Sequence, residues 1–369
     1  MEQIPSITIA GRKIGPGLPV YIVAEVSCNH RGSFEKALAL IQAAKEAGAD
    51  AVKLQTYTAD TITLNCDNRY FRIEGDNTWA GRTLHALYEE THTPWQWQPK
   101  LLEAAKKAGI TLFSSPFDPT AVAFLEQLNM PAYKVASFEL IDIPLIQCVA
   151  KTNKPVILST GLGSFSEIAE AVSVVRACGN NQVAVLKCTS DYPAKPQDIH
   201  LSSIKHLQKA LHVPVGLSDH SLGSAVAIGA AALGACIIEK HLILSHADGG
   251  PDGGFSMDVH EFKAMVAGIR EIEQAIGDPE APISAAQERN RIFRRSLFIV
   301  QDIQAGEMFT ESNIRSIRPG HGLAPKYLPL VLGKHAAGTL KKGEPLRWEH
   351  VSHGRTAEKK DAAEAASRR

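Results

Sequence analysis

The chain has 369 residues, of which 44% are hydrophobic, and it carries 39 basic and 39 acidic side chains. This composition suits a globular enzyme with a substantial core, and the balanced charge gives no electrostatic reason to expect nucleic acid or an anionic membrane as a partner. The six cysteines show no CxxC spacing, the N-terminus lacks a signal-peptide layout and no apolar run is long enough to span a bilayer, so we expect a cytoplasmic protein with reduced thiols.

Eight short apolar runs each end in a cluster of reactive polar side chains. In chain order they are residues 21–29, 51–58, 111–117, 132–140, 156–161, 183–192, 215–221 and 235–244. Near-continuous apolar runs are typical of buried parallel strands, and the helix-like stretches between them indicate βαβ units. Eight such units predict an α/β fold of the (β/α)8 TIM-barrel type, whose active site lies where the strands end.

The segments between the runs carry apolar residues at helical spacing, most clearly over residues 34–47. The gap 59–110 is longer than one crossover helix requires, and it contains Trp79, Trp95 and Trp97. A long aromatic-rich loop at the catalytic end of a barrel is more often functional than idle. The alternative, that these rings only fix the loop to the barrel, remains open.

After the last outer helix the periodicity changes to short strands with glycine turns. We therefore predict a barrel domain over residues 1–280, a polar linker over 281–293 and a small β-rich domain over 294–352. The tail 353–369 is charged and alanine-rich, and we expect it to be disordered.

Two histidines follow the last two predicted strands, in the sequences SDH and EKH. Because the ends of adjacent strands meet at one rim, His220 and His241 are candidates to share a divalent metal ion. Two histidines alone are a weak metal signal. Hydrogen bonding of each ring within the rim is the alternative.

Three lysines, Lys53, Lys134 and Lys187, lie inside otherwise apolar strands, where an unpaired charge is costly to bury. If they face one cavity, they favour a phosphate or carboxylate ligand; a Schiff-base lysine is the rival interpretation. Hydroxyl groups follow the same strands, at Ser114, Ser115, Ser137, Ser159, Thr160, Thr189, Ser190 and Ser218. No GxxxxGK[ST] loop is present, which argues against a nucleoside triphosphate.

Carboxylates complete the predicted rim: Glu25, Glu139, Asp219, Glu239 and Asp252. A carboxylate in such a place can act as a base toward water or hold a sugar hydroxyl.

These residues carry a resemblance that covers the whole chain. The segments AEVSCNHRGS, AGADAVKLQTY, FSSPFD, AYKVASFEL, ILSTG, KCTSDYPA, VGLSDHS, IIEKH, GGPD and IRPGHG, in this order, resemble the sialic acid synthase family, including its C-terminal SAF (antifreeze-protein-like) domain. Within the family the chain is most similar to the pseudaminate-forming branch, through VKLQTYTADTITL and TWAGRTLHALYEETHTPWQW. The branches that form N-acetylneuraminate or N,N'-diacetyllegionaminate are the alternatives.

The resemblance implies a transferase that condenses phosphoenolpyruvate with the open-chain aldehyde of an N-acetylated amino sugar and water, releasing phosphate by C–O cleavage. For the pseudaminate branch the sugar is 2,4-diacetamido-2,4,6-trideoxy-L-altrose. A divalent ion, Mn²⁺ or alternatively Mg²⁺ or Co²⁺, would activate the aldehyde. The opposing view is a carbohydrate-binding SAF module beside an inactive barrel.

By the same resemblance, individual residues take roles. The phosphoenolpyruvate-binding positions are matched by Lys53, Ser115, Lys134, Ser137, Ser159, Ser190 and Ser218, where Ser190 replaces an asparagine of relatives. His220 and His241 match metal ligands; Glu139, Tyr192 and Asp252 match sugar contacts; Gln55 joins the substrate-binding set, and Glu25 would guide water. Arg318 matches an arginine that the SAF domain of a partner subunit supplies, which implies a domain-swapped homodimer.

Overall fold

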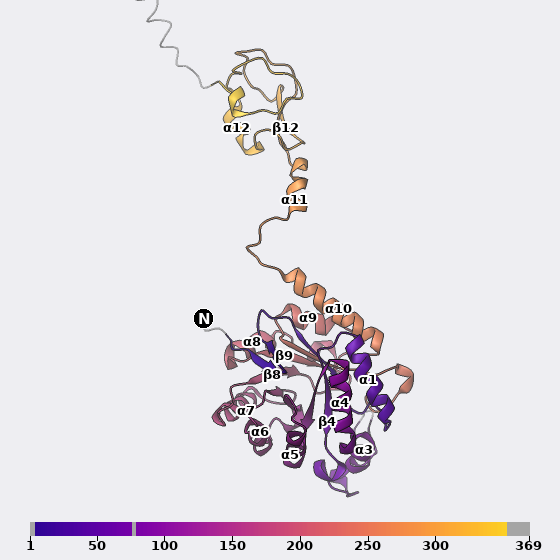
Figure 1. Ribbon diagram of the computed structural model, residues 1–369. Helices are drawn as coiled ribbons and strands as arrows, with labels where there is room; N and C mark the ends of the chain where they lie inside the picture. Colours follow the sequence, from indigo (N-terminus) through magenta and orange to yellow (C-terminus); the bar gives the residue numbers. More distant parts are fainter. Residues whose placement is uncertain (1–3, 76–78, 353–369) are drawn as a thin grey trace, which may run out of the picture. The chain divides into compact units, whose positions relative to one another are not determined.

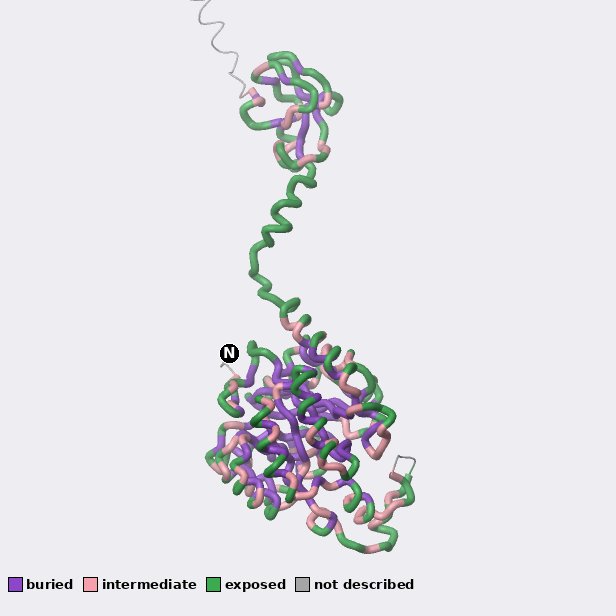
Figure 2. The backbone as a smooth tube through the Cα atoms, turned by 45° about the vertical axis from the view of Figure 1, so that its right-hand side comes forward, coloured by how far each residue is buried: buried purple, intermediate pink, exposed green. Residues whose placement is uncertain are grey.

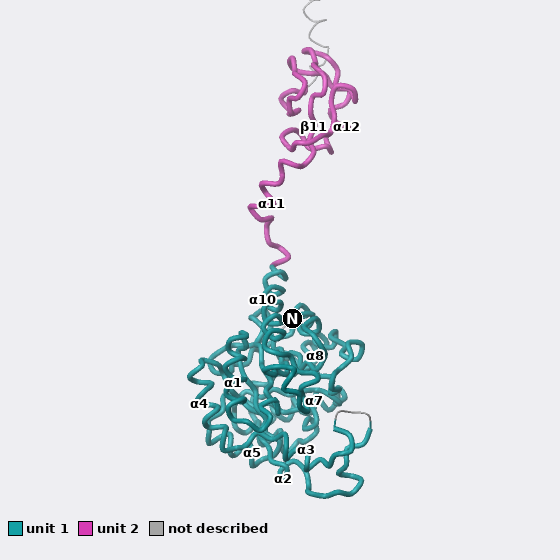
Figure 3. Tube along the Cα trace, turned by 90° about the vertical axis from the view of Figure 1, so that its right-hand side faces the viewer, with its two compact units in different colours: residues 1–277 teal, residues 278–369 magenta. Residues whose placement is uncertain are grey.

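The computed structural model describes residues 4–75 and 79–352 (Figure 1). The chain forms two compact units, residues 1–277 and 278–369, each with its own hydrophobic core (Figure 3). The tail predicted at 353–369 lies outside the described residues.

In the described part of the first unit, eight parallel strands close into a barrel with helices around it (Figure 1). The strands are β3 (Tyr21–Glu25), β4 (Ala51–Thr56), β5 (Thr111–Pro116), β6 (Tyr133–Val135), β7 (Val156–Ser159), β8 (Val183–Cys188), β9 (Val215–Asp219) and β10 (Ile237–His241). Each pairs in parallel with the next along the chain, and β10 returns to pair with β3. This closed parallel sheet confirms the predicted TIM barrel.

The outer layer consists of α1 (Phe34–Glu46), α4 (Gln98–Ala108), α5 (Pro119–Gln127), α6 (Ile143–Ala150), α7 (Phe165–Ala177), α8 (Ser203–Leu211), α9 (Ala225–Ala232) and α10 (Val259–Ile276). Local sequence sets many of their ends. Ser33 begins α1 because its Oγ accepts the N–H of Lys36 at 3.2 Å. Gly109 ends α4 in the left-handed conformation, with φ of 68°.

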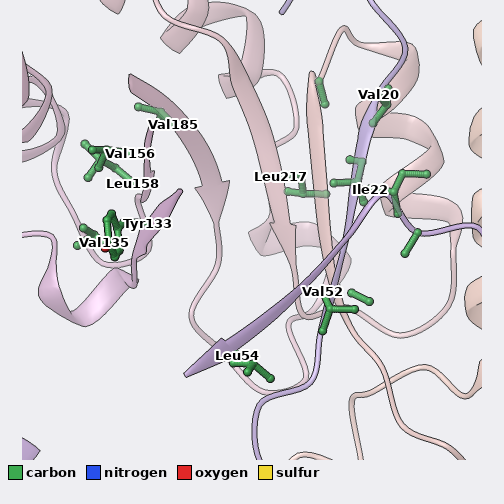
Figure 4. Packing of buried hydrophobic residues seen from close by; sticks show 14 of the residues in the cluster. Val20, Ile22, Val52, Leu54, Tyr133, Val135, Val156, Leu158, Val185 and Leu217 are labelled. Carbon is green, nitrogen blue, oxygen red and sulfur yellow. The ribbon is translucent and has the colours of Figure 1, made fainter. Parts of the chain in front are cut away.

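Alternate residues of each strand face opposite sides of the barrel wall. Outward-facing residues pack against the helices, and Figure 4 shows several of them: Val52, Leu54, Tyr133, Val135, Val156, Leu158, Val185 and Leu217. Burial is accordingly concentrated in the strands and the inner faces of the helices (Figure 2). Inward-facing residues such as Ala51 and Phe113 form a second, smaller cluster inside the barrel.

An N-terminal hairpin closes the barrel where the strands begin. It consists of β1 (Ile7–Ile9) and β2 (Arg12–Ile14), which pair in antiparallel fashion. Ile7, Ile9 and Ile14 are almost fully buried and belong to the inward-facing cluster. We did not predict this hairpin, because strands of three residues carry too little periodicity to be distinguished from a loop.

The long gap between β4 and β5 holds two additional helices, α2 (Ala59–Ile62) and α3 (Leu84–Thr91), before the crossover helix α4. Trp95 stacks on Phe124 with ring centroids 4.9 Å apart, and Trp97 packs edge-on against Phe34. These two tryptophans therefore fix the segment to the barrel.

The second unit is built around β11 (Ser296–Ile299), which pairs with β12 (Ile314–Ile317) in antiparallel fashion, and the short helix α12 (Leu328–Val331). Its core comprises Leu297, Ile299, Ile303, Phe309, Ile314, Val331, Ala336, Leu340, Leu346 and Val351. The segment predicted as a linker contains the short helix α11 (Ala285–Arg289), which Ser284 caps. Among the described residues, no helix combines the length and the apolar character that crossing a bilayer requires.

Candidate active site

A cavity of about 470 Å³ lies at the carboxyl ends of the barrel strands. Most of the predicted site residues line it: Glu25, Lys53, Gln55, Lys134, Ser137, Glu139, Ser159, Tyr192, Ser218, His220, His241 and Asp252. The two-residue period of a strand explains this convergence, because Lys53 and Gln55 continue the inward-facing series that begins at Ala51. The volume falls within the range of roughly 300–1,000 Å³ that is typical of small-molecule sites.

Two lysines and two glutamates form the charged centre of the cavity. Lys53 Nζ lies 2.5 Å from Glu25 Oε2 and 3.8 Å from Glu239 Oε1. Lys134 Nζ donates to the same Glu239 oxygen at 3.1 Å, and the Ser218 hydroxyl donates to it at 2.9 Å. The four charged side chains are at most 5% exposed. Their charges balance, so a bound anion would share the lysines with the carboxylates.

The two carboxylates differ in the direction of their pKa shifts. Burial raises the pKa of Glu25, and the neighbouring Lys53 offsets this only in part. Burial also opposes ionisation of Glu239, but Lys134 and Lys53 outweigh it and lower the pKa of Glu239 to about 2. Glu239 therefore stays anionic, whereas Glu25 is the carboxylate better suited to carry a proton.

Serine hydroxyls surround Gly161, which follows β7. The N–H of Gly161 donates to Ser137 Oγ at 3.1 Å. A Cβ at Gly161 would collide with Ser190 Oγ and lie 2.7 Å from Ser137 Oγ, so only glycine fits at this position. The buried hydroxyl of Ser159 has no hydrogen-bond partner within the described residues. This group of hydroxyls offers donors to an anionic ligand.

His220, directly after β9, and His241, the last residue of β10, lie side by side with ring centroids 5.4 Å apart. The Nδ1–H of His220 donates to the carbonyl oxygen of Thr189 at 3.0 Å, which leaves the lone pair on Nε2. Nδ1 of His241 is buried and has no hydrogen-bond partner in the described part of the chain. Burial lowers the pKa of His241 well below its ordinary value, and the positive charges of Lys53 and Lys134 act in the same direction. A neutral imidazole with an unused nitrogen is the form that binds a metal.

Cys188 and Phe255 complete the surroundings of the histidines. Cys188 Sγ lies 3.8 Å from His220 Nδ1, and although burial raises the pKa of this thiol, His220 lowers it to about 7. Phe255 meets both imidazoles edge-on, with ring centroids 6.2 Å from His220 and 5.0 Å from His241. This apolar cover limits water at the two rings.

Two further carboxyl groups lie in the cavity wall. Burial raises the pKa of Glu139 to about 7, and its Oε2 has no hydrogen-bond partner among the described residues. Burial also raises the pKa of Asp252, although hydrogen bonds with Ser27 and Cys28 oppose this. Both groups are thus placed to exchange hydrogen bonds with a polar ligand.

The segment between β4 and α4 forms an apolar side of the cavity. Its lining residues are Ile62, Ile73, Trp79, Leu84, Leu87 and Tyr88. The Trp79 ring lies 5.7 Å from that of Tyr192, which packs on His220 with ring centroids 4.4 Å apart. Trp79 is therefore part of the cavity wall, unlike Trp95 and Trp97.

Two residues expected at the rim face the helix layer instead. Lys187 lies between the inward-facing Leu186 and Cys188, and its Nζ donates to Cys188 O at 2.8 Å. Asp219 forms an ion pair with Lys240 at 2.8 Å, behind the barrel wall. Both expectations were wrong for the same reason: a neighbour of an inward-facing strand residue points outward.

Three other predicted residues do not line the cavity itself. Ser115 Oγ accepts a hydrogen bond from Lys53 at 3.3 Å, and Ser190 Oγ lies 3.7 Å from Cys188 Sγ. Both serines therefore contact lining residues. Arg318 follows β12 in the second unit.

Sequence reasoning missed one member of the site and the contacts of another. Glu239 was named among the rim carboxylates, but its position between two lysines was not foreseen, because it depends on contacts from β4 and β6. Cys188 was not predicted to belong to the site and was considered only as one of the reduced thiols. Its place in the inward-facing series Ala184, Leu186, Cys188 is a signal that could have identified it.

Another group of candidate metal ligands lies at the start of α10. Ligand atoms of His246, Asp258 and Glu261 are within 4.8 Å of one another. Asp258 and Glu261 already form the capping box of α10, and His246 Nε2 lies 2.8 Å from Glu261 Oε2. These contacts account for the group as a helix cap.

Comparison with known proteins places the chain in a family. The NeuB family model matches residues 40–281, and the SAF domain model matches residues 294–352. The chain is 44% identical to pseudaminic acid synthase of Campylobacter jejuni over 328 residues, which are 89% of this chain and 95% of that protein. It is also 44% identical to pseudaminic acid synthase of Helicobacter pylori, over 90% of this chain and 98% of that protein.

A solved structure agrees with these matches. The spore coat polysaccharide biosynthesis protein SpsE of Bacillus subtilis is 33% identical and aligns with a TM-score of 0.64, covering 95% of this chain and all of that one. The family model covers more than half of the chain, and the relatives confirm the sequence resemblance over about nine-tenths of it. The protein therefore belongs to the NeuB family and carries a C-terminal SAF domain.

Proposed function

We propose that this protein is a pseudaminic acid synthase, which condenses phosphoenolpyruvate with 2,4-diacetamido-2,4,6-trideoxy-L-altrose and water to give pseudaminic acid and phosphate. The observation that carries the proposal is the convergence of Lys53, Lys134, His220 and His241 on one cavity, in a chain 44% identical to synthases of that name.

Phosphoenolpyruvate would bind at the charged centre and the serine hydroxyls. Lys53 and Lys134 supply the positive charge that a phosphate and a carboxylate need, while Ser137 and Ser159 supply neutral donors. Because Glu239 neutralises part of the lysine charge, the site would hold the substrate without trapping the released phosphate.

The residues present fit a divalent metal. Nδ1 of His241 is a buried nitrogen without a partner among the described residues, and His220 is held by Thr189 O with Nε2 free to ligate. We propose Mn²⁺ as the ion, with Mg²⁺ or Co²⁺ as alternatives. When bound, it would polarise the aldehyde oxygen of the sugar.

Glu25 is placed to guide the water that adds to C2 of phosphoenolpyruvate. Burial raises the pKa of Glu25, so it can take a proton from water more readily than Glu239 can. Lys53, 2.5 Å from Glu25, would stabilise the anionic groups of the tetrahedral intermediate as it expels phosphate.

The apolar side of the cavity supports a 6-deoxy sugar. Ile73 and Leu84 line the same cavity as the polar residues Glu139 and Asp252, and an apolar wall suits a methyl group better than a hydroxymethyl group. N-acetylneuraminate and N,N'-diacetyllegionaminate synthesis by the same chemistry are the alternative functions.

We further propose that Arg318 reaches the cavity of a partner subunit in a domain-swapped homodimer. Exposed apolar side chains in the loops after β6, β7 and β9 support a covering partner at the barrel mouth: Phe138, Ile141, Leu162 and Leu222 are each at least 58% exposed. The six cysteines, all within the described residues, are free, which supports a location in the cytoplasm.

The experiment that tests the function is phosphate release from phosphoenolpyruvate with a panel of N-acetylated amino sugars. Phosphoenolpyruvate with oxygen-18 in the C2–O–P bridge should yield labelled phosphate, because the C–O bond breaks. Unlabelled phosphate, or no turnover with any amino sugar, would contradict the proposal. Trapping of a lysine adduct by borohydride would instead favour a Schiff-base aldolase.

A further inference from the structure

A buried ion pair lies directly behind the two candidate metal ligands. In the parallel pairing of β9 with β10, Asp219 stands opposite Lys240, and both face the helix layer. His220 follows Asp219 in the chain, and His241 follows Lys240. The side chains of Lys240 and Asp219 are 0% and 1% exposed, and neither lines the cavity, so neither contacts solvent or a ligand bound there.

The Lys240 ammonium group donates all its hydrogen bonds to residues 219–223, the short segment that contains His220. It donates to Asp219 Oδ2 at 2.8 Å, to the carbonyl oxygen of Ser221 and to that of Gly223 at 3.4 Å. An ammonium group has three donors and no acceptor, so these contacts satisfy it fully. Lys240 therefore ties β10 to residues on both sides of His220.

Asp219 completes the network from the other strand. Its Oδ1 accepts the backbone N–H of Ser221 at 2.9 Å and the Ser221 hydroxyl at 2.7 Å. Residues 219, 221 and 223 are thus held to one ammonium group, and His220 has little freedom to move relative to His241.

We infer that the Asp219–Lys240 pair is a positioning device for the metal site, which sets the separation of the two histidines; the inference rests on the metal site of the proposed function. A buried ion pair gives little net stability compared with apolar residues of similar size, so stability alone does not account for it. Outer contacts that orient ligands, in contrast, strongly affect how tightly a metal binds.

The test measures Mn²⁺ binding to the chelator-treated full chain by calorimetry and by the loss of the electron paramagnetic resonance signal of free Mn²⁺. Thermal unfolding of each protein is recorded in parallel. The double variant Asp219→Leu/Lys240→Met removes both charges at once, so that no buried charge is left unpaired. We expect it to fold and to bind Mn²⁺ about 10- to 100-fold more weakly than the wild type. The control Arg270→Met breaks an ion pair with Asp50 and should leave Mn²⁺ affinity unchanged.

Each outcome separates the two proposals. A folded double variant with wild-type Mn²⁺ affinity overturns the positioning role while leaving the metal site intact. A wild-type chain that binds no Mn²⁺, Co²⁺ or Mg²⁺ overturns the metal site itself. If the double variant does not fold, Ser221→Ala keeps the ion pair but removes one hydrogen bond to Asp219, and unchanged Mn²⁺ affinity in that variant would count against the inference.

Discussion

Lys53 and Lys134 both lie close to the carboxylate of Glu239, and this shared contact affects how strongly each lysine can bind an anionic substrate. Burial lowers the pKa of Lys134, although Glu239 opposes this shift, so the carboxylate helps to keep the ammonium group charged. The same carboxylate competes with a substrate anion for both lysines. Removing one lysine should therefore weaken substrate binding and leave Glu239 less well paired.

The first prediction is that Lys134→Met raises KM for phosphoenolpyruvate about 100-fold, because a charge-assisted contact of about 2–3 kcal/mol is lost. Steady-state kinetics of phosphate release measure the change. Lys187→Met is the matched control, since that lysine lies on β8 without lining the cavity, and its removal should leave KM unchanged. Equal effects of the two variants would contradict the assignment.

The second prediction concerns Glu139, whose pKa burial raises to about 7. The group is protonated below this pH and ionised above it, and only the ionised form accepts hydrogen bonds from sugar hydroxyls with both oxygens. KM for the sugar should therefore fall as the pH rises from about 6 to about 8. Kinetics across this range should show a flatter dependence for Glu139→Gln; the same slope in both proteins would remove Glu139 from this role.

Two elements outside the eight-strand pattern have distinct tasks. The β1–β2 hairpin closes the barrel with buried isoleucines at the end remote from the cavity, and it contributes packing without chemistry. The segment with α2 and α3 lies at the opposite end and supplies the apolar side of the cavity. Variants in the hairpin should thus change stability, whereas variants in the α2–α3 segment should change selectivity.

The third prediction is that Ile9→Ala lowers the free energy of unfolding by about 2–5 kcal/mol, because it leaves a cavity in the inward-facing cluster. Urea denaturation measures the loss, and kcat/KM of the folded enzyme should stay unchanged. Thr8→Ala, on the less buried face of the same strand, should cost no more than about 0.5 kcal/mol. A drop in kcat/KM for folded Ile9→Ala would show that the hairpin also affects the site.

The fourth prediction is that Ile73→Ser lowers the preference for a 6-deoxy sugar over its 6-hydroxy analogue by about tenfold, since a methyl group in an apolar pocket is worth about 1–3 kcal/mol. The ratio of kcat/KM for the two sugars is the measurement. Leu64→Ser is the control, because this leucine is 60% exposed and does not line the cavity. An unchanged ratio would place the sugar methyl elsewhere.

At the scale of the whole molecule, the cavity and Arg318 belong to different compact units. The NeuB and SAF matches fall within these two units, apart from the last residues of the barrel match. Whether Arg318 acts on the cavity of its own chain or on that of a partner can be separated by mixing two inactive variants.

The fifth prediction is that Arg318→Ala and Lys134→Met regain activity when they are unfolded and refolded together. Both are assayed at a phosphoenolpyruvate concentration near the KM of the wild type, where we expect each variant alone to be almost inactive. A hybrid dimer then contains one cavity with an intact barrel and an intact Arg318 from the partner. If Arg318 acts within its own chain, no such combination arises and the mixture stays inactive. Phosphate release before and after mixing measures the difference, and the wild type carried through refolding controls for recovery.

The barrel and most of the cavity lining could be predicted because both depend on local pattern. An apolar strand ending in polar residues is visible along the chain, and parallel strands bring those ends to one rim, as Lys53, Lys134, His220 and His241 show. The direction of each side chain was predicted less well. Lys187 and Asp219 lie in the same strands as true lining residues, and a shift of one residue sends them to the outer face.

Sequence alone was enough to infer the eight-strand order, the division into a barrel and a small C-terminal domain, and the family, because these follow from hydrophobic periodicity and from the order of the motifs. Which charged side chains come into contact, in contrast, depends on the folded barrel. Glu239 joins Lys53 of β4 to Lys134 of β6, and Lys240 joins β10 to the turn that carries His220. These pairings link residues distant in sequence, and their strength depends on burial, so they arise only when the closed barrel excludes water from around them.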